Sequence, residues 1–499
     1  MKKLITKILC VTLAAVLLAG CQTNGGEGGD ISKQDQTTDA ATETEPVDED
    51  DPGFTIDEEV EAKKNGFKGE TLRILANTGF WPADDIYREE DSSEPVDSAI
   101  YQRNLALSEK YGYGIDFVGS ANVNKDIKDA YKAGIKDYDV VVYCAYEACP
   151  AASSNIFLDL TTVPNLNLGK RYWDQGLFEG LSIDGKLFYV TGDISTKANS
   201  GTFLCMFNKK VAADHDVEDL YAAVRNGTWT MDKMYSISKE IGYRDDGDSK
   251  VGVEDFFPLA IQYEIYLALF YGQGGRISQK DENDLPVLCV GDERNVAVID
   301  KIYKQTLTDN LAIDAHDYLP YADQHGIFAS TAAFMDDRAL FYFTNAGNIP
   351  GLREMKSDFG VLPNPKYDEN QKDYFSYVYH GVSMYMIPVL AKDRADFIGY
   401  ALETMAYESH NTVTPAYYDV TLLNKSQRDP DSYEMMDIAF RNRIWDLGYF
   451  AKWGSLDEQI SGQIKKGTGS YANFVKRVTR SAEKAIKKYI DAYKDSTSK

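Results

Sequence analysis

The chain is rich in carboxylates but carries none of the common catalytic signatures. Its 499 residues include 78 Asp and Glu, and two carboxylates that flank a glycosidic bond can hydrolyse it. With so many acidic residues, no particular pair stands out. The sequence contains no GxSxG elbow, no HExxH helix and no plausible Cys–His pair. A secreted glycoside hydrolase with paired carboxylates is therefore one possible function, which we keep as the alternative to the binding function described below.

The cysteines and histidines do not form a metal-binding pattern. There is no CxxC pair, and the five histidines are scattered, so we expect no metal site and no cofactor. Four of the six cysteines lie in the main body of the chain: Cys144, Cys149, Cys205 and Cys289. Outside a cell they could form disulfides, with Cys144 and Cys149 closing a small loop, but four cysteines allow three pairings.

Residues 244–255, RDDGDSKVGVED, resemble a calcium-binding loop. Such a loop needs acidic ligands at alternating positions, glycine at the sixth position and a carboxylate at the twelfth. Here Arg244 occupies the first ligand position and Ser249 replaces the glycine. We therefore expect a solvated acidic turn without an ion.

The N-terminus has the pattern of a secretory signal. Lys2 and Lys3 precede a mostly apolar run, Leu4–Leu18, which is shorter than the roughly 20 residues of a transmembrane helix. The next residues, Leu-Ala-Gly-Cys ending at Cys21, resemble the lipobox of bacterial lipoproteins. The resemblance implies that residues 1–20 are removed and that Cys21 is lipidated. The protein would then be anchored by lipid on the extracellular face of the cell membrane.

The segment after Cys21 reads as a linker. Residues 22–52 contain ten acidic residues, one lysine and no aromatic residue, so they have too little apolar surface to fold. We expect a disordered acidic linker over 21–66. The net charge of −25 also argues against nucleic acid as a partner, because nucleic-acid binding requires basic patches.

The body of the chain begins with alternating strands and helices. The patterns predict strands at 71–76, 115–118 and 139–143, with helices at 98–111 and 126–136. This alternation is typical of an α/β layer with a largely parallel sheet. In such sheets, ligands bind beyond the carboxyl ends of the strands.

Later segments follow helical spacing. Thr230 is a good N-cap for a helix, which makes Trp229 a core residue. Apolar residues also recur at helical spacing over 392–407 and, for five turns, over 471–490. We expect the last helix to pack on one lobe, with its lysine-rich face in solvent.

Several segments, in this order and spacing, resemble the extracellular solute-binding lipoproteins of ABC importers, in the sugar-binding, family 1-like branch of Gram-positive bacteria. The segments that carry the resemblance include AIYQRNLALSEKYGYGIDF (99–117), YDVVVYCAYE (138–147), IFLDLTTVPNLNLGKRYWDQG (156–176), IDGKLFYVTGDIS (183–195), MFNKKV (206–211) and NGTWTMDKMYSISKEI (226–241). The resemblance covers nearly all of residues 70–490.

The family resemblance implies a two-lobe, periplasmic-binding-protein-like (type II) clamshell of the α/β class, each lobe a sheet flanked by helices. Carried onto this chain, lobe 1 comprises 67–194 plus 382–430, lobe 2 comprises 200–380 plus 431–495, and crossovers lie near Thr191–Ser200 and His380–Ser383. The implied function is capture of a sugar or oligosaccharide and its delivery to the membrane subunits of an ABC permease. We expect a monomer that is not an enzyme.

A sugar offers a flat apolar face and a rim of hydroxyls, which proteins meet with aromatic rings and with carboxylates or amides. Trp81 follows the first strand, and Asp193, beside the first crossover, is the preferred carboxylate. The other candidate ligand residues lie in apparent loops or at element ends: Tyr143, Tyr146, Glu147, Asn345, Tyr417 and Trp453.

Overall fold

The computed structural model describes residues 53–79, 81–248, 250–262, 264–422 and 430–495. The described residues from Ile56 onward belong to one compact unit. The predicted signal peptide (1–20) and Cys21 lie outside the described residues. Within the described ranges, no helix has both the length and the apolar character needed to cross a membrane.

Ordered structure begins inside the segment that we predicted to be a disordered linker. The helices α2 (Glu58–Glu61) and η1 (Ala62–Asn65) both precede residue 67. Val60 is buried in the core, and Asp57 forms an ion pair with Lys170 at 2.8 Å. The linker prediction was therefore wrong for these residues, because one apolar side chain and one tertiary ion pair hold them to the body.

The first sheet has four strands in the order β12-β3-β1-β2. β1 pairs in parallel with both β2 and β3, whereas β12 is antiparallel to β3. Every residue of β3 is buried, as expected for a strand covered on both faces. The strand–helix–strand prediction is confirmed, with β1 (Thr71–Asn77), α3 (Pro95–Tyr111), β2 (Gly114–Ser120), α4 (Val123–Ala133), β3 (Val140–Cys144) and β12 (Ser383–Met386).

The second sheet has five strands in the order β10-β4-β9-β5-β8. β5 is parallel to β8 and β9, and β4 is antiparallel to β9 and β10. Its strands are β4 (Phe203–Asn208), β5 (Leu259–Ile261), β8 (Ala312–Asp314), β9 (Phe341–Asn345) and β10 (Phe359–Leu362). The helices nearest to it in sequence are α8 (Lys209–Asp214), α9 (Leu220–Arg225), α10 (Met231–Ile241), α11 (Ile265–Gly272), α12 (Glu293–Thr306), α13 (Leu319–His325) and α14 (Ala329–Met335).

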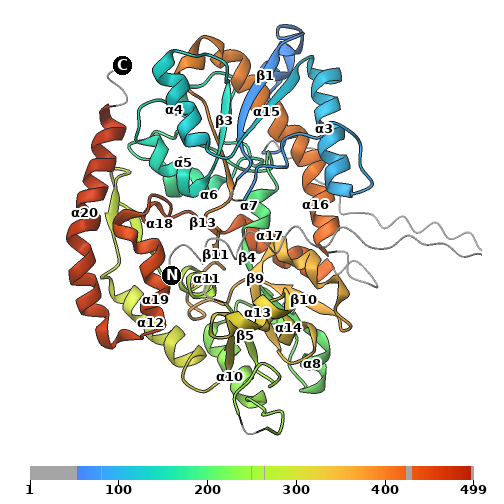
Figure 1. Cartoon of the computed structure of the whole chain (residues 1–499), viewed down its shortest axis with the longest axis vertical. Helices are drawn as coiled ribbons and strands as arrows, with labels where there is room; N and C mark the ends of the chain where they lie inside the picture. Colours follow the sequence, from blue (N-terminus) through green and yellow to red (C-terminus); the bar gives the residue numbers. More distant parts are fainter. Residues whose placement is uncertain (1–52, 80, 249, 263, 423–429, 496–499) are drawn as a thin grey trace, which may run out of the picture. The chain divides into compact units, whose positions relative to one another are not determined.

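The chain passes between the two sheets more than once (Figure 1). The first passage contains α7 (Lys197–Ser200) and leads into β4, and the second leads from β11 (Ser376–Tyr377) into β12. A bridge between Thr202 and Val378 joins the two passages. One hydrophobic core also includes residues of both sheets, among them Tyr143 and Phe343.

The remaining helices lie late in the chain, and the helix predicted at 392–407 is confirmed as α15. Their bounds are α15 (Ala395–Asn411), α16 (Val413–Leu422), α17 (Pro430–Arg441), α18 (Leu447–Phe450), α19 (Leu456–Ile464) and α20 (Tyr471–Asp495). The predicted cap is confirmed as well, because the Thr230 side chain accepts a hydrogen bond from the Lys233 backbone N–H and Trp229 is fully buried.

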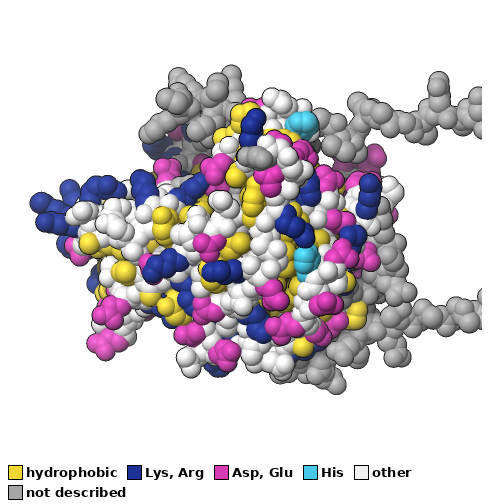
Figure 2. All heavy atoms as spheres, turned by 90° about the horizontal axis from the view of Figure 1, so that it is seen from below, with side chains coloured by type: hydrophobic (Ala, Val, Ile, Leu, Met, Phe, Trp, Pro, Cys, Tyr) yellow, Lys and Arg dark blue, Asp and Glu magenta, His cyan; other side chains and the backbone are white. Residues whose placement is uncertain are grey.

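The C-terminal helix α20 contacts more of the chain than we expected. Near its start, Tyr471 donates a hydrogen bond to the Val290 carbonyl, after β7 (Pro286–Leu288). Near its end, Tyr489 donates to the Cys149 carbonyl in the segment after β3. In Figure 2, Lys and Arg side chains gather at the edge where α20 lies in Figure 1, and acidic and basic side chains alternate elsewhere on that face.

Candidate ligand-binding site

Five aromatic side chains from separate parts of the chain lie against one another. Trp81 follows β1, and Tyr146 lies in α5 (Ala145–Ala152), directly after β3. Tyr379 and His380 precede β12, and Tyr449 lies in α18. We call these five side chains the aromatic cluster. Its position beyond β1 and β3 agrees with the general location of ligand sites in α/β sheets.

The rings of the aromatic cluster are in direct contact. The ring centroids of Trp81 and Tyr379 are 4.9 Å apart, and those of Tyr379 and His380 are 4.3 Å apart. Tyr146 meets His380 edge-on at 5.2 Å, and His380 Nδ1 lies 2.8 Å from the Tyr449 hydroxyl. Trp81, Tyr146 and His380 are half-buried. The cluster therefore presents aromatic surface that a ligand can reach.

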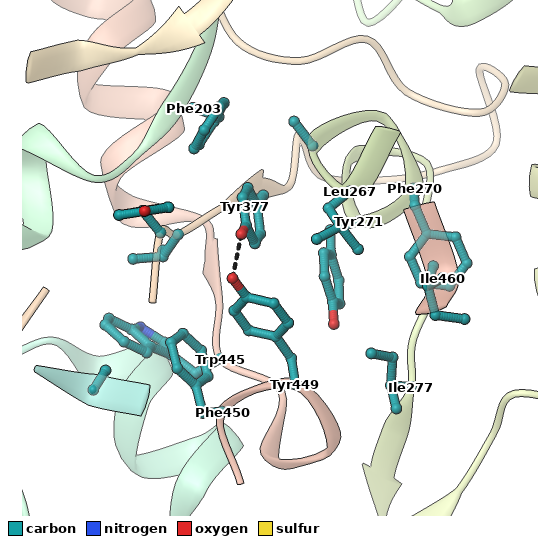
Figure 3. Close-up of a cluster of buried hydrophobic side chains, with 14 of the residues drawn as sticks. Phe203, Leu267, Phe270, Tyr271, Ile277, Tyr377, Trp445, Tyr449, Phe450 and Ile460 are labelled. Atoms are coloured by element: carbon teal, nitrogen blue, oxygen red, sulfur yellow. Dashed lines mark hydrogen bonds between the residues drawn. The ribbon is translucent and has the colours of Figure 1, made fainter. Parts of the chain in front are cut away.

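A second layer of aromatic residues supports the cluster (Figure 3). The hydroxyls of Tyr377 and Tyr449 are hydrogen-bonded, and the ring of Tyr271 stacks on Tyr377 with a centroid distance of 5.8 Å. Asp446 holds the start of α18, because its carboxylate accepts hydrogen bonds from the backbone N–H groups of Gly448 and Ile277. Buried, hydrogen-bonded rings of this kind fix the positions of the residues above them.

Three carboxylates surround the aromatic cluster. Glu147 follows Tyr146 in α5, Glu264 immediately precedes α11, and Asp457 lies in α19. All three are half-buried, and burial raises the pKa of each. After desolvation, the charge of Glu264 also contributes to the raised pKa of Tyr379, which indicates that the two groups are close.

The aromatic cluster has less positive charge beside it than negative charge. Lys452 Nζ lies 4.2 Å from the ring centroid of Tyr146, and its charge opposes the raised pKa of Glu147 and of Asp457. Burial, and secondarily Lys452, lowers the pKa of His380 to about 4. At neutral pH, His380 is therefore uncharged and can both donate and accept a hydrogen bond.

Local backbone geometry holds Trp81 in place. Its φ of 51° lies in the left-handed region, and its carbonyl accepts a hydrogen bond of 3.1 Å from Asn77 Nδ2. A β-carbon added at Gly381 would lie 2.8 Å from Trp81 Cγ. Only glycine at position 381 therefore lets the indole occupy its observed position.

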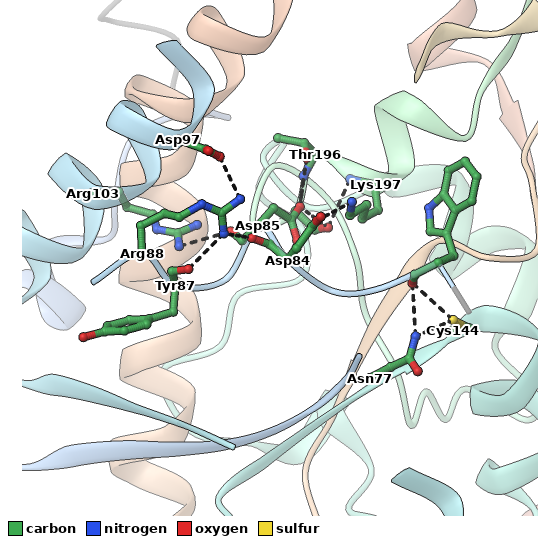
Figure 4. A network of polar contacts seen from close by, with 12 residues as sticks. Asn77, Asp84, Asp85, Tyr87, Arg88, Asp97, Arg103, Cys144, Thr196 and Lys197 are labelled. Carbon is green, nitrogen blue, oxygen red and sulfur yellow. Dashed lines mark hydrogen bonds and ion pairs between the residues drawn. The ribbon is translucent and has the colours of Figure 1, made fainter. Parts of the chain in front are cut away.

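The loop that carries Trp81 is tied to the first passage between the sheets (Figure 4). Asp85 accepts hydrogen bonds from the Ser195 hydroxyl at 2.7 Å and from the Thr196 backbone N–H at 2.5 Å. Asp84 forms an ion pair with Lys197. The position of the loop is thus coupled to the segment that leads into β4.

The structure brings together three of the predicted ligand residues, namely Trp81, Tyr146 and Glu147. Tyr143 is adjacent to them but fully buried, with its ring edge-on to Phe157 at 6.0 Å. The Tyr143 hydroxyl has no hydrogen-bond partner in the described part of the chain. The first three can therefore contact a ligand directly, whereas Tyr143 lies beneath the surface.

The other four predicted residues lie elsewhere. The Asp193 carboxylate is 2.7 Å from His410 Nδ1, and Asn345 is buried at the end of β9. Tyr417 is buried among residues of the second sheet. Trp453 is buried with its ring 5.7 Å from that of Tyr489 in α20. None of the contacts described for these four residues involves the aromatic cluster.

Several members of the site were missed from the sequence: Glu264, Tyr379, His380, Tyr449, Lys452 and Asp457. A signal was available for two of them. His380 stands at the predicted second crossover, and Glu264 follows a short apolar strand, as Tyr146 does. For Lys452 and Asp457 no local pattern distinguishes them from other charged residues near helix ends.

A small pocket lies beside the Trp81 loop. Its volume is about 190 Å³, and it is lined by Thr78, Pro82, Ala83, Asp84, Tyr87, Arg88 and Phe117. Ligand pockets typically measure about 300–1,000 Å³. Its two charged groups are already paired, Asp84 with Lys197 and Arg88 with Asp97. We therefore assign the ligand to the aromatic cluster instead.

The structure gives no support for a ligand site at the cysteines or in the acidic loop at 244–255. The four cysteines at positions 144, 149, 205 and 289 are buried, and none of them forms a disulfide within the described ranges. In the acidic loop, oxygens of Asp245, Asp246 and Asp248 lie within 4.8 Å of one another, and all three residues are exposed. Asp255 is instead hydrogen-bonded to Tyr243 at 2.6 Å. An ion-free turn remains our prediction for this loop.

Comparison with known proteins identifies the fold. No family model matches the chain, and no curated protein matches it. Among solved structures, a sugar transporter from Rhizobium etli in an open conformation is similar at 14% identity and a TM-score of 0.55, over 85% of this chain and 99% of that one. A family 1 extracellular solute-binding protein from Bifidobacterium longum subsp. infantis matches at 12% identity and a TM-score of 0.50, over 86% and 100% of the two chains. The chain has the fold of the family 1 solute-binding proteins.

This solute-binding-protein fold confirms the α/β, two-lobe architecture expected from the sequence. A further match shows that the fold does not fix the ligand. UgpB from Mycobacterium tuberculosis, solved in complex with glycerophosphocholine, is 14% identical with a TM-score of 0.52, over 84% of this chain and 99% of that one. The identity of the ligand must therefore be argued from the side chains of the site.

Proposed function

We propose that the chain is the extracellular substrate-binding component of an ABC transporter, which captures a sugar or oligosaccharide and delivers it to a membrane permease. The observation that carries the proposal is the aromatic cluster with its carboxylates, located beyond the strands of a solute-binding-protein fold. Rings contact the flat face of a sugar, while carboxylates accept hydrogen bonds from its hydroxyls.

The protein has no catalytic role in this proposal. It acts as a monomer, and ligand contacts made from both sheets favour a closed state over an open one. Glu264 follows a strand of the second sheet, whereas Trp81 and Glu147 follow strands of the first. A ligand held between these side chains draws the two sheets together.

Binding assays with the full-length protein, purified in detergent, test the proposal. Isothermal titration calorimetry against a panel of mono- and oligosaccharides should find binding, and chromatography of the same mixtures should find the saccharides intact. Release of shorter saccharides would favour the glycoside hydrolase with paired carboxylates. Absence of binding to every saccharide would reject the proposed ligand class.

The proposal includes a lipid anchor at Cys21 on the extracellular face of the cell membrane. The support is the sequence pattern at residues 1–21. The linker that follows would give the body freedom to reach a permease. Metabolic labelling with a fatty-acid analogue should mark the parent protein and leave Cys21→Ser unlabelled.

The predicted role of Asp193 is tested separately. Asp193→Ala should weaken saccharide binding at least several-fold if its carboxylate contacts the ligand. His410→Ala is measured beside it, because this variant keeps the Asp193 carboxylate and removes the partner that the structure shows for it. Equal affinity for the parent and both variants would exclude this pair from the site.

A further inference from the structure

The carboxylates around the aromatic cluster are not balanced by protein cations. Glu147, Glu264 and Asp457 form no ion pair within 4.0 Å in the described ranges. Lys197, which is near Cys144 at the edge of the cluster, is already paired with Asp84. Among the described residues, Lys452 acts on Glu147 and Asp457, and His316 acts on Glu264. Three half-buried carboxylates therefore face one lysine and one histidine.

The site also contains polar atoms that have no partner within the described chain. Trp81 Nε1 and Asp457 Oδ1 are each buried without a hydrogen-bond partner. Buried polar groups are normally satisfied, and exceptions call for an explanation. A ligand that supplies hydrogen bonds at this place is the simplest one.

The aromatic rings favour positive charge in the same place. Lys452 already lies 4.2 Å from the ring centroid of Tyr146, which is the geometry of a cation–π contact. The neutral His380 adds no positive charge of its own. A ligand ammonium that enters the cluster would meet ring faces and carboxylates together, as in the aromatic sites that recognise organic cations.

A neutral sugar would satisfy hydrogen bonds but not the charge. Covering an unpaired carboxylate with a neutral ligand removes its water without supplying a counter-charge, which costs free energy. A protonated amine supplies both the hydrogen bonds and the counter-charge. Hydrogen bonds between charged groups are also roughly twice as strong as those between neutral groups.

We infer that the ligand carries a basic amine, and that the site selects amino sugars or their oligomers over neutral saccharides. The inference rests on the proposed function and specifies the ligand class of the same site. Glu264 and Glu147 are the residues that we assign to the amine, since both stand beside rings of the cluster.

Saccharides that differ only at the C2 substituent test the inference. Glucosamine, N-acetylglucosamine and glucose, and their β-1,4-linked tetramers, are titrated into the full-length protein in detergent at about pH 6, where the amines are charged. We expect the amine to bind at least tenfold more tightly than either neutral analogue, which corresponds to about 1.4 kcal/mol. This preference should shrink as salt is raised.

Two variants and a control test which residues cause the preference for the amine. Glu264→Gln and Glu147→Gln should each reduce the ratio of amine to neutral affinity, because glutamine keeps the shape and loses the charge. Glu109→Gln, on the exposed face of α3, should leave both affinities unchanged. Thermal unfolding of each variant separates a loss of charge from a loss of folding. Unchanged ratios in both site variants would overturn the assignment to these residues.

The remaining outcomes separate the inference from the function on which it rests. Neutral saccharides that bind as tightly as the amines would overturn the inference and leave the proposed function standing. Spermidine is included as an amine without a sugar. Binding of spermidine with no binding of any saccharide would support a cation site and reject a sugar as the ligand. Absence of all binding would reject both.

Discussion

The buried carboxyl group of Glu403 predicts how the stability of this protein depends on pH. Glu403 lies in α15 and is fully buried. It accepts hydrogen bonds from Tyr172, from Trp173 Nε1 at 2.9 Å and from the Asn167 backbone N–H at 3.1 Å. Trp173 in turn bridges to Gly192, next to the first passage between the sheets. The group therefore holds in place a segment that leads to the site.

Burial is the main reason that the pKa of Glu403 rises from 4.5 to about 7. The folded protein then holds a proton that the unfolded chain has already released. Its stabilising contribution is complete below about pH 4.5 and is lost as the pH rises through about 7. At 1.36 kcal/mol per pKa unit, the loss amounts to about 3 kcal/mol.

Glu403→Gln removes this titration and keeps the shape of the side chain. The free energy of unfolding is measured by urea denaturation, followed by tryptophan fluorescence, for parent and variant between about pH 4.5 and 7.5. The parent-minus-variant difference should fall by about 3 kcal/mol over this range. Glu109→Gln, in an exposed position of α3, is the control. A parent-minus-variant difference that stays constant with pH would refute the reasoning.

Other predictions concern the site and the anchor. Trp81→Ala should weaken ligand binding at least several-fold by calorimetry, whereas Tyr131→Ala, on the exposed side of α4, should not change it. Gly381→Ala should also weaken binding, because the new methyl group would displace the indole at position 81; an unchanged affinity would contradict the close packing. Trp453→Ala should instead lower the free energy of unfolding by about 3–5 kcal/mol, as measured by denaturation, because this ring is buried against α20. Cys21→Ser should release the protein from membranes into the medium, as assayed by immunoblotting of the two fractions.

Local patterns in the sequence were sufficient to predict the elements of the first sheet. The continuous apolar run at 140–143 is part of a buried strand, and the alternation at 71–76 is its parallel neighbour. The spacing of apolar residues also located α15 and α20. Such patterns are readable because the period of burial follows directly from the geometry of strands and helices.

The same local reasoning located three residues of the candidate site. Trp81, Tyr146 and Glu147 come directly after strands whose carboxyl ends were predicted, so their neighbourhood followed from the α/β arrangement. Asp193 also stands beside a predicted crossover, but its carboxylate faces His410. Its position in the sequence could not tell which way its side chain turns.

The rest of the site was decided only by tertiary structure. Glu264, His380 and Lys452 are separated from Tyr146 by more than a hundred residues along the chain, and each belongs to a different segment. What brings them together is the packing of the two sheets and of the helices after residue 430. The charge of a pocket depends on which distant side chains share it, and local periodicity carries no information about such contacts.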